Sequence, residues 1–446
     1  ITSGVSGATI NGLSGAGSVY TVTVNTGSGN GTIRLDVSVS ATINDIAGNP
    51  LTAPFISGET YTVNKSEDVY IGGTLKGIYF LTPASSVRDS YASVNSGPAR
   101  VVSLTTPIID SMRVLFGGVS YSEMMGFPAD KLTTDYWFPY YNNVAMDSQL
   151  RVSNVGGSPT TITVTYGNNL PLDSYPLAAG AATRKNYAGI NSGPLHVVSS
   201  TSNILTTIRV LYGGLSYSEL MGFPNNQLTT DYWYPYYNNV AMDSQLRVSN
   251  VGGSSTTITV TYGNNIALDS YTLPAGAAMR KNYLGINSGP LHVVSSTSNI
   301  LTTIRVLYAN QSFSEISGFP ANQLTREYTY PVYNNVSADS QLRVSNVGGV
   351  STTITVYGAN NAVIDTYTLA AGAATRKNYA GVNNGPLHVV SSASNILSTQ
   401  RLLYTTASFG SFYELTGFPT NQLTTDYYFL WYNNTAMSSQ LRIAVP

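Results

Sequence analysis

The chain has 446 residues and a formal net charge of −1, and only 10% of its residues are charged. The lack of excess positive charge excludes an electrostatic footprint for nucleic acid or anionic lipid. The sequence contains no run of about 20 apolar residues, so no membrane span is predicted. A chain of this length needs several domains. With no cysteine and 33 tyrosines among many Val, Ile and Thr, it is expected to be an exported, strand-rich protein.

Residues 1–66 alternate apolar and polar residues around Gly/Ser/Asn turns, which predicts strands, and "NDIAGNPL" then predicts a loop. The run "YTVTVNTGSGNGT", followed by "RLDV", "AGNPL" and "SGE", resembles the immunoglobulin-like domains of large bacterial surface proteins. This resemblance covers residues 1–64. It implies that the first strands of the domain precede Ile1, so that they are cleaved, absent from this chain or supplied by another chain.

The rest of the chain is a repeat. Gly-Pro pairs begin at Gly97, Gly193, Gly289 and Gly385, each 96 residues apart. The "GFP" and "YNN" motifs run 96, 96 and 99 apart, which places a three-residue insertion in the last copy. We divide the chain into residues 1–66, a partial immunoglobulin-like domain, and four repeats at 67–157, 158–253, 254–349 and 350–446.

Within a repeat the apolar residues have a period of two. Ile162, Val164 and Tyr166 share one face of a strand, and Leu150 and Val152 share a face of the strand before it. The link of residues 155–159 between these strands predicts a hairpin. Strands at this spacing predict about seven per unit, so the predicted fold is all-β: tandem immunoglobulin-like β-sandwiches arranged as beads on a string.

The motifs "GPLHVVSS", "SYSEMMGFP", "LTTDYWFPYYNN" and "DSQLRVSNVG" are similar to tandem β-repeats of secreted proteins from filamentous bacteria. This resemblance implies an extracellular location and a structural architecture. It implies no catalytic chemistry.

The phase of the repeat points to the two ends of the array. Subtracting 96 from Tyr166 aligns it with Tyr70, and the last copy stops just after Arg442. If the linked strands form a hairpin inside the array, the first and last strands each lack a partner. Three outcomes stay open: a head-to-tail fibre through strand exchange, an intramolecular ring, or local coverage of each edge. The predicted assembly interface is Val69, Tyr70, Ile71, Gln440, Leu441, Arg442, Ile443 and Val445.

Charged residues recur once per repeat. His196, His292 and His388 are the only histidines and are interpreted as strand-surface residues, because a metal or catalytic site needs several converging groups. A partly buried structural pair is predicted in each repeat between an arginine and a glutamate: Arg113 with Glu123, Arg209 with Glu219, Arg305 with Glu315, and Arg401 with Glu414.

Trp137, Trp233 and Trp431 are candidate glycan-facing aromatics, but packing within or between sandwiches is the preferred interpretation. Asn44, Asp45 and Asn49 are weighed as calcium ligands and interpreted as turn residues. Glycosylation sequons begin at Asn30, Asn64, Asn310 and Asn433.

No catalytic motif, metal site or cofactor site is predicted, so the chain is not expected to be an enzyme. The predicted function is a secreted structural subunit of an extracellular or cell-surface fibre or sheath, with itself as partner. The alternative is a cell-surface adhesin or carbohydrate-binding stalk that does not polymerise and contacts cell-surface glycans.

Overall fold

A computed structural model describes residues 1–446 except 18 and 28. Strands dominate it, and the helical segments it describes are five 3-10 turns: η1 (Ala129–Lys131), η2 (Asn225–Gln227), η3 (Ala321–Gln323), η4 (Ala359–Asn361) and η5 (Thr420–Gln422). The predicted all-β class of tandem β-sandwich domains is confirmed. Across the described residues, no helix has the length and apolarity needed to cross a bilayer.

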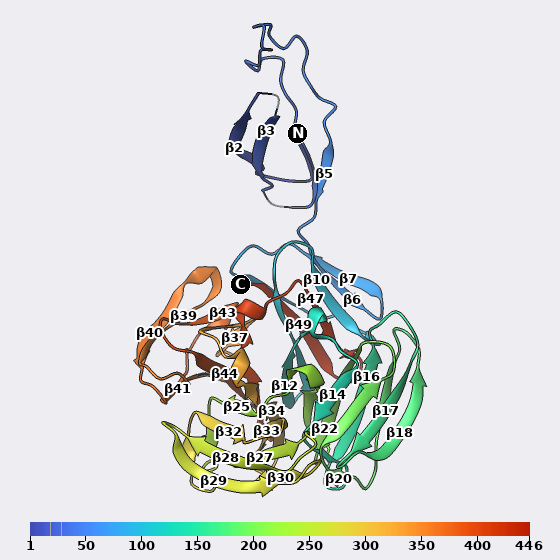
Figure 1. The fold of residues 1–446 in the computed structure, drawn as a ribbon, viewed down its shortest axis with the longest axis vertical. Helices are drawn as coiled ribbons and strands as arrows, with labels where there is room; N and C mark the ends of the chain where they lie inside the picture. Colours follow the sequence, from blue (N-terminus) through green and yellow to red (C-terminus); the bar gives the residue numbers. More distant parts are fainter. Residues whose placement is uncertain (18, 28) are drawn as a thin grey trace.

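The N-terminal domain stands outside the rest of the molecule (Figure 1). It consists of a three-stranded sheet, β1-β4-β5, and a separate hairpin, β2-β3. The bounds are β1 (Thr2–Ser3), β2 (Thr9–Ala16), β3 (Val19–Asn25), β4 (Gly31–Arg34) and β5 (Thr60–Val63). A cavity of about 530 Å³ lies between the two pieces and is lined by apolar residues such as Ile10, Val22 and Phe55.

Three sandwiches repeat one plan, in which a five-stranded and a four-stranded sheet pack face to face and a two-stranded ribbon lies beside them. We call residues 135–224 unit 1, residues 231–320 unit 2 and residues 327–419 unit 3. In unit 1 the five-stranded sheet has the order β18-β17-β21-β14-β24, and the four-stranded sheet has the order β19-β16-β22-β23.

The strands of unit 1 are β14 (Asp135–Phe138), β15 (Tyr141–Asn142), β16 (Asp147–Asn154), β17 (Thr160–Tyr166), β18 (Leu170–Leu177), β19 (Ala182–Lys185), β20 (Asn191–Ser192), β21 (Leu195–Ser199), β22 (Ile204–Tyr212), β23 (Ser216–Met221) and β24 (Phe223–Pro224). Those of unit 2 are β25 (Asp231–Tyr234), β26 (Tyr237–Asn238), β27 (Asp243–Asn250), β28 (Thr256–Tyr262), β29 (Ile266–Leu273), β30 (Ala278–Lys281), β31 (Asn287–Ser288), β32 (Leu291–Ser295), β33 (Ile300–Tyr308), β34 (Ser312–Ser317) and β35 (Phe319–Pro320). Those of unit 3 are β36 (Glu327–Tyr330), β37 (Tyr333–Asn334), β38 (Asp339–Asn346), β39 (Thr352–Tyr357), β40 (Val363–Leu369), β41 (Ala374–Lys377), β42 (Asn383–Asn384), β43 (Leu387–Ser391), β44 (Ile396–Thr405), β45 (Gly410–Thr416) and β46 (Phe418–Pro419).

The fourth sandwich, which we call the composite unit, is built from both ends of the repeat array. Its N-terminal strands are β6 (Glu67–Ile71), β7 (Thr74–Tyr79), β8 (Ser85–Asp89), β9 (Asn95–Ser96), β10 (Ala99–Ser103), β11 (Ile109–Phe116), β12 (Ser120–Met125) and β13 (Phe127–Pro128). Its C-terminal strands are β47 (Asp426–Phe429), β48 (Tyr432–Asn433) and β49 (Ser438–Val445). Because β47 pairs with β10 and β49 lies between β8 and β11, the four sandwiches close into a ring (Figure 1).

The predicted hairpin across residues 155–159 is wrong. Strand β16 pairs with β19 and β22, whereas β17 pairs with β18 and β21. The glycine-rich link therefore crosses from one sheet of a sandwich to the other. As a result the sandwiches are out of phase with the predicted repeat limits, and the boundary at 157/158 falls inside unit 1.

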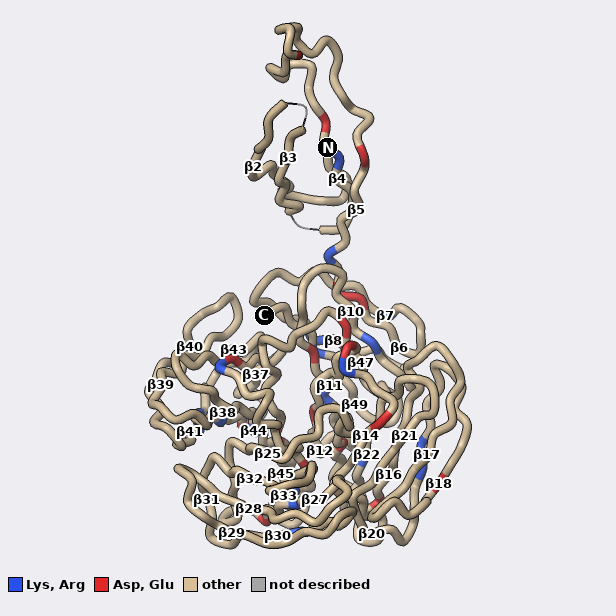
Figure 2. Tube along the Cα trace, in the orientation of Figure 1, with Lys and Arg blue, Asp and Glu red and all other residues tan. Residues whose placement is uncertain are grey.

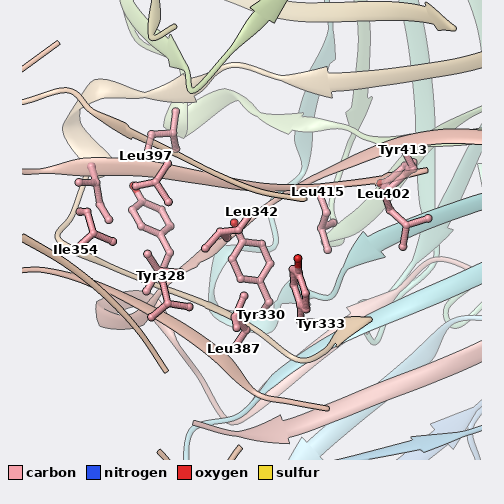
Figure 3. Close-up of a cluster of buried hydrophobic side chains, with 14 of the residues drawn as sticks. Tyr328, Tyr330, Tyr333, Leu342, Ile354, Leu387, Leu397, Leu402, Tyr413 and Leu415 are labelled. Atoms are coloured by element: carbon pink, nitrogen blue, oxygen red, sulfur yellow. The ribbon is translucent and has the colours of Figure 1, made fainter. Parts of the chain in front are cut away.

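Each sandwich encloses a core of alternating apolar residues, and the core of unit 3 is shown in Figure 3. Three of the four cores also take an aromatic residue from the innermost strand of the next unit in the ring. Phe313 of unit 2 belongs to the core of unit 1, Phe412 of unit 3 to that of unit 2, and Tyr121 of the composite unit to that of unit 3. Neighbouring units therefore share their cores.

A circle of hydrogen bonds joins the four innermost strands, β12, β23, β34 and β45. At each step the hydroxyl oxygen of a buried serine accepts a hydrogen bond, at 2.8–2.9 Å, from the backbone N–H of an aromatic residue in the neighbouring strand. The same hydroxyl donates a hydrogen bond to the carbonyl of that residue. The serines are Ser120, Ser216, Ser312 and Ser411, and the residues bound are Tyr217, Phe313, Phe412 and Tyr121. The circle is complete only because the array closes on itself.

Candidate functional site

The strands predicted to be unpaired are both paired within the chain. Val69 and Ile71 lie in β6, between β7 and β10, and both are buried. In β49, Leu441, Ile443 and Val445 point into the core of the composite unit. Gln440 and Arg442 face the other way, and Arg442 is 5% exposed. The expectation of two open edges is therefore corrected: the ends of the array complete one sandwich.

Tyr70 is not the counterpart of Tyr166. The hairpin from β6 to β7 turns through Gly72 and Gly73, whereas the equivalent hairpin of unit 1 has one residue more between its strands. Tyr70 consequently pairs with Arg100, as Thr165 pairs with His196 in unit 1. The one-residue deletion places Tyr70 on the outer face of its sheet.

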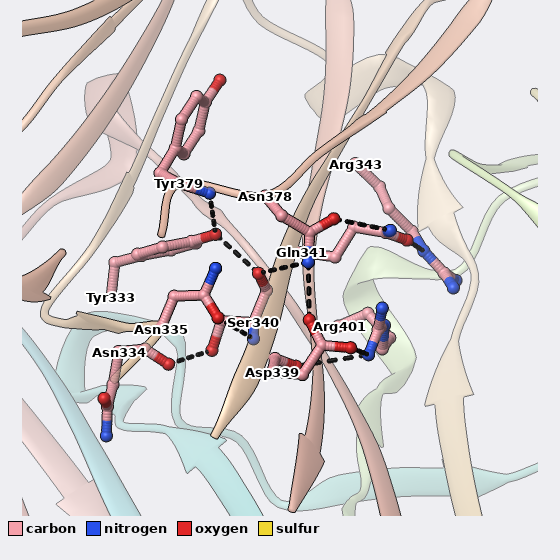
Figure 4. A network of polar contacts seen from close by, with 10 residues as sticks. All are labelled: Tyr333, Asn334, Asn335, Asp339, Ser340, Gln341, Arg343, Asn378, Tyr379 and Arg401. Atoms are coloured by element: carbon pink, nitrogen blue, oxygen red, sulfur yellow. Dashed lines mark hydrogen bonds and ion pairs between the residues drawn. The ribbon is translucent and has the colours of Figure 1, made fainter. Parts of the chain in front are cut away.

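The predicted Arg–Glu pairs are also corrected. Arg209, Arg305 and Arg401 lie directly across the ladder from their predicted glutamates but form ion pairs with aspartates, at 2.7–2.8 Å, in the strand on the other side: Asp147, Asp243 and Asp339. Figure 4 shows this arrangement around Arg401. In the composite unit Ser438 replaces the aspartate, and Arg113 bonds its hydroxyl at 3.4 Å.

The glutamates bind a different arginine, the one in the "SQLR" motif. The pairs are Arg151–Glu219 at 3.3 Å, Arg247–Glu315 at 3.0 Å, Arg343–Glu414 at 2.8 Å and Arg442–Glu123 at 2.7 Å. All eight side chains are at least nine-tenths buried. Burial lowers the pKa of Arg247 and Arg343, and the attraction of the glutamates only partly offsets it. The recurring second arginine was visible in the sequence, but its position on the same sheet face as the glutamate depends on the strand order.

The outer face of each five-stranded sheet carries a row of three residues on neighbouring strands. The rows are Thr165–His196–Trp137 in unit 1, Thr261–His292–Trp233 in unit 2, Tyr357–His388–Thr329 in unit 3 and Tyr70–Arg100–Tyr428 in the composite unit. In each row an acidic residue lies two positions before the third residue, on the same strand: Asp135, Asp231, Glu327 and Asp426. The three histidines thus lie on strand surfaces, each beside an acid.

In units 1 and 2 the tryptophan of the row stacks on the histidine of the same row. Trp137 stacks on His196 with ring centroids 3.6 Å apart and an interplanar angle of 8°, and Trp233 stacks on His292 at 3.7 Å. Asp135 holds His196 at 2.6 Å, and the Trp137 indole N–H donates to Asn225 at 3.0 Å. One face of each indole is therefore covered by an imidazole.

Trp431 occupies a different position in its repeat. It follows the row by three residues, where unit 1 has Tyr140. These aromatics contact the next unit of the ring: Arg184 lies 5.2 Å from the Trp431 ring centroid, and Arg247 and Arg280 lie 5.2 and 4.8 Å from that of Tyr140. Trp431 thus contributes to the contact between the composite unit and unit 1, with its indole N–H bonded to Asn95 at 2.7 Å.

The row of the composite unit lines a cavity of about 560 Å³ between that unit and unit 1. Tyr70, Arg100 and Tyr428 form one wall, and Asn154, Val155 and Gly180 of unit 1 form the opposite one. Arg100 donates two hydrogen bonds to Asp426, at 2.8 and 2.6 Å, which hold the pKa of Arg100 above its usual value. Its guanidinium also lies 5.3 Å from the Tyr428 ring centroid.

A second cavity, of about 270 Å³, is lined by equivalent residues of all four units and so lies on the axis of the ring. Phe127, Phe223, Phe319 and Phe418 contribute to its apolar wall. Its polar lining includes Lys131, Gln227, Gln323 and Gln422, which follow the four sandwiches in the chain, and the buried Glu219, Glu315 and Glu414.

The remaining predicted residues make local contacts. Asp45 accepts hydrogen bonds from the backbone of Ala47 and Asn49 and from the Asn49 side chain, all at 2.9 Å, which lowers its pKa. These are the bonds of a turn. Of the sequon asparagines, Asn30 and Asn64 bond each other at 2.5 Å, whereas Asn310 lies in an exposed turn. Within the described part of the chain, no three His, Cys, Asp or Glu side chains gather into a metal site.

No family model and no curated protein matches the chain. Among solved structures, the BSP domain of a biofilm associated protein matches the chain at 10% identity. The match covers 87% of this chain and 74% of that one. The TM-score is 0.14, so this similarity carries no argument about fold or function.

Proposed function

We propose that this chain is an extracellular binding protein of the cell surface, an adhesin type of module that acts as a monomer and does not polymerise through its terminal strands. The observation that carries this proposal is the closure of the ring, because β6 and β49 have neighbours on both sides. A strand donated by another molecule would have to displace β49 from between β8 and β11.

The surface chemistry supports the same proposal. Charged residues are few and scattered around the ring (Figure 2), so recognition must rely on neutral polar and aromatic groups. The N-terminal domain stands beyond the rim of the ring and leaves its centre uncovered (Figure 1). Such an arrangement suits a head held away from the surface that carries it.

The test is the mass of the purified chain in sedimentation equilibrium over a hundredfold range of concentration. We expect a single species of 47.5 kDa throughout. Concentration-dependent growth into long filaments, seen by electron microscopy, would refute the proposal.

A fibre or sheath subunit is the second candidate, and one observation favours it. The apolar cavity of about 530 Å³ in the N-terminal domain, with Ile10 and Phe55 more than half exposed, has the character of a strand-accepting cleft. Filaments that persist after deletion of Gln440–Pro446 but vanish with Ile10→Asp would favour this candidate.

A further inference from the structure

Three of the four seams of the ring are closed by the same contact. The turn that follows β17, or its equivalent, touches a small residue of the next unit. A Cβ on Gly276 would lie 2.6 Å from the Cα of Asn168, and one on Gly372 would lie 2.8 Å from that of Asn264. At the third seam the Asn360 N–H bonds the carbonyl of Ala84, at 2.9 Å.

The fourth seam, between the composite unit and unit 1, lacks this contact. Gly180 occupies the position of Gly276, yet a Cβ placed there would meet no atom within 4 Å. The β6–β7 turn at Gly72 and Gly73 is one residue shorter than the equivalent turns of units 1 and 2, so it does not reach Gly180. The missing residue leaves the groove of about 560 Å³, a volume within the range of about 300–1,000 Å³ usual for ligand sites.

The row at the open seam carries two tyrosines and an arginine, a combination that the rows of units 1, 2 and 3 do not have. Tyr70 and Tyr428 flank Arg100 on neighbouring strands, so two aromatic rings and a guanidinium share one face. In units 1 and 2 the row has one aromatic, and a histidine covers it. The deletion and the second aromatic therefore occur together, at the same seam.

The charge of the groove decides the class of ligand. Arg100 donates hydrogen bonds from Nε and Nη2 to Asp426, so its positive charge is paired with a negative one. The other lining residues are neutral. The groups that face a ligand include the Nη1 group and the second Nη2 hydrogen of Arg100, the hydroxyls of Ser96, Tyr70 and Tyr428, and the two tyrosine rings. Planar apolar faces beside neutral donors and acceptors match the alternating C–H and O–H surface of a sugar.

We infer that the groove between the composite unit and unit 1 is a binding site for a neutral oligosaccharide, formed by Tyr70, Arg100 and Tyr428. This inference rests on the proposed function, for which it supplies the ligand class and the site. Tyrosine rings pack against the sugar, and Arg100, fixed by Asp426, donates to its hydroxyl groups.

The test uses the full chain and isothermal titration with cellotriose, maltotriose and triacetylchitotriose, with trigalacturonate as the anionic comparison. We expect at least one neutral trisaccharide to bind with a dissociation constant below about 1 mM. Tyr428→Ala is expected to weaken that binding at least tenfold. Thr261→Ala, at the row position of Tyr70 in the closed seam of unit 2, is the matched control and is expected to leave it unchanged.

A second variant tests the seam itself. Inserting one asparagine between Gly72 and Gly73 restores the turn length of the other units and is expected to abolish binding while the circular dichroism spectrum stays unchanged. The inference is overturned if none of the neutral sugars binds, if trigalacturonate binds more tightly than all of them, or if Tyr428→Ala or the insertion leaves binding intact. A monomeric chain that fails these tests would overturn the site alone, whereas a polymer would overturn the proposed function.

Discussion

Deleting Gln440–Pro446 removes most of β49, the strand that closes the ring. Leu441, Ile443 and Val445 are 1%, 1% and 3% exposed, and each buried side chain of this size contributes about 1.5–3 kcal/mol, which together amounts to about 5–9 kcal/mol. The deletion also removes Arg442 and leaves Glu123 buried without its counter-ion, which costs about 3–5 kcal/mol more. The loss rivals the whole stability of a typical domain, about 5–15 kcal/mol, so the composite unit should unfold.

Hydrogen exchange read by mass spectrometry can separate the units. We expect amides of β8 and β11, the neighbours of β49, to lose protection in the deletion variant, while the β16–β22 ladder of unit 1 keeps most of its protection. Deletion of Pro446 alone is the control, because this residue follows the strand. Wild-type protection in β8 and β11 of the larger deletion would refute the intramolecular closure.

Three further predictions concern buried polar groups. Arg343→Met should lower the free energy of unfolding by about 3–5 kcal/mol, because Glu414 is left buried and unpaired. Arg401→Met should cost about 1 kcal/mol or less in urea unfolding, because the side chain left without its partner, Asp339, is half-exposed to water. Asp110 is buried without a hydrogen-bond partner for its carboxyl group, and burial raises its pKa well above the ordinary value, so the folded state holds the proton more tightly and stability falls as pH rises above about 3.9. Asp110→Thr should therefore raise the urea midpoint more at pH 7 than at pH 4, and an equal change at both would contradict this. Ser216→Ala should cost about 1–3 kcal/mol, since a buried backbone amide of unit 2 loses its acceptor, and an unchanged melting curve would contradict the circle of bonds.

Much of the fold was predictable from the sequence, because a period of two and a repeat of 96 residues together identify strands and count units. The pairing of those strands was not. The link at residues 155–159 has the composition of a hairpin turn, yet it joins two sheets, and only the positions of β21 and β22 decide between these outcomes. The wrong phase of the sandwiches follows from this single step.

The candidate site shows the same limit. The sequence identified the strands around Tyr70 and Arg442 as special, and ring closure was among the outcomes it left open. The groove depends instead on the deletion of one residue in the turn at Gly72 and Gly73. The recurring motifs on either side of this glycine-rich turn still align, so the deletion is not evident from them. Likewise, the recurring Glu219 was recognised as a partner for an arginine, but its real partner, Arg151, is two strands away in the same sheet.

The composite unit also sets an order of events during folding. Units 1 to 3 use contiguous stretches of chain and can form as each is made, whereas Asp110 meets Ile443 only after every unit between them exists. Contacts so distant in sequence form late, and until then β11 and β12 expose an unfinished core. The first repeat strands to emerge are therefore among the last to become native, and a chain stopped before β49 has three sandwiches and an unprotected edge.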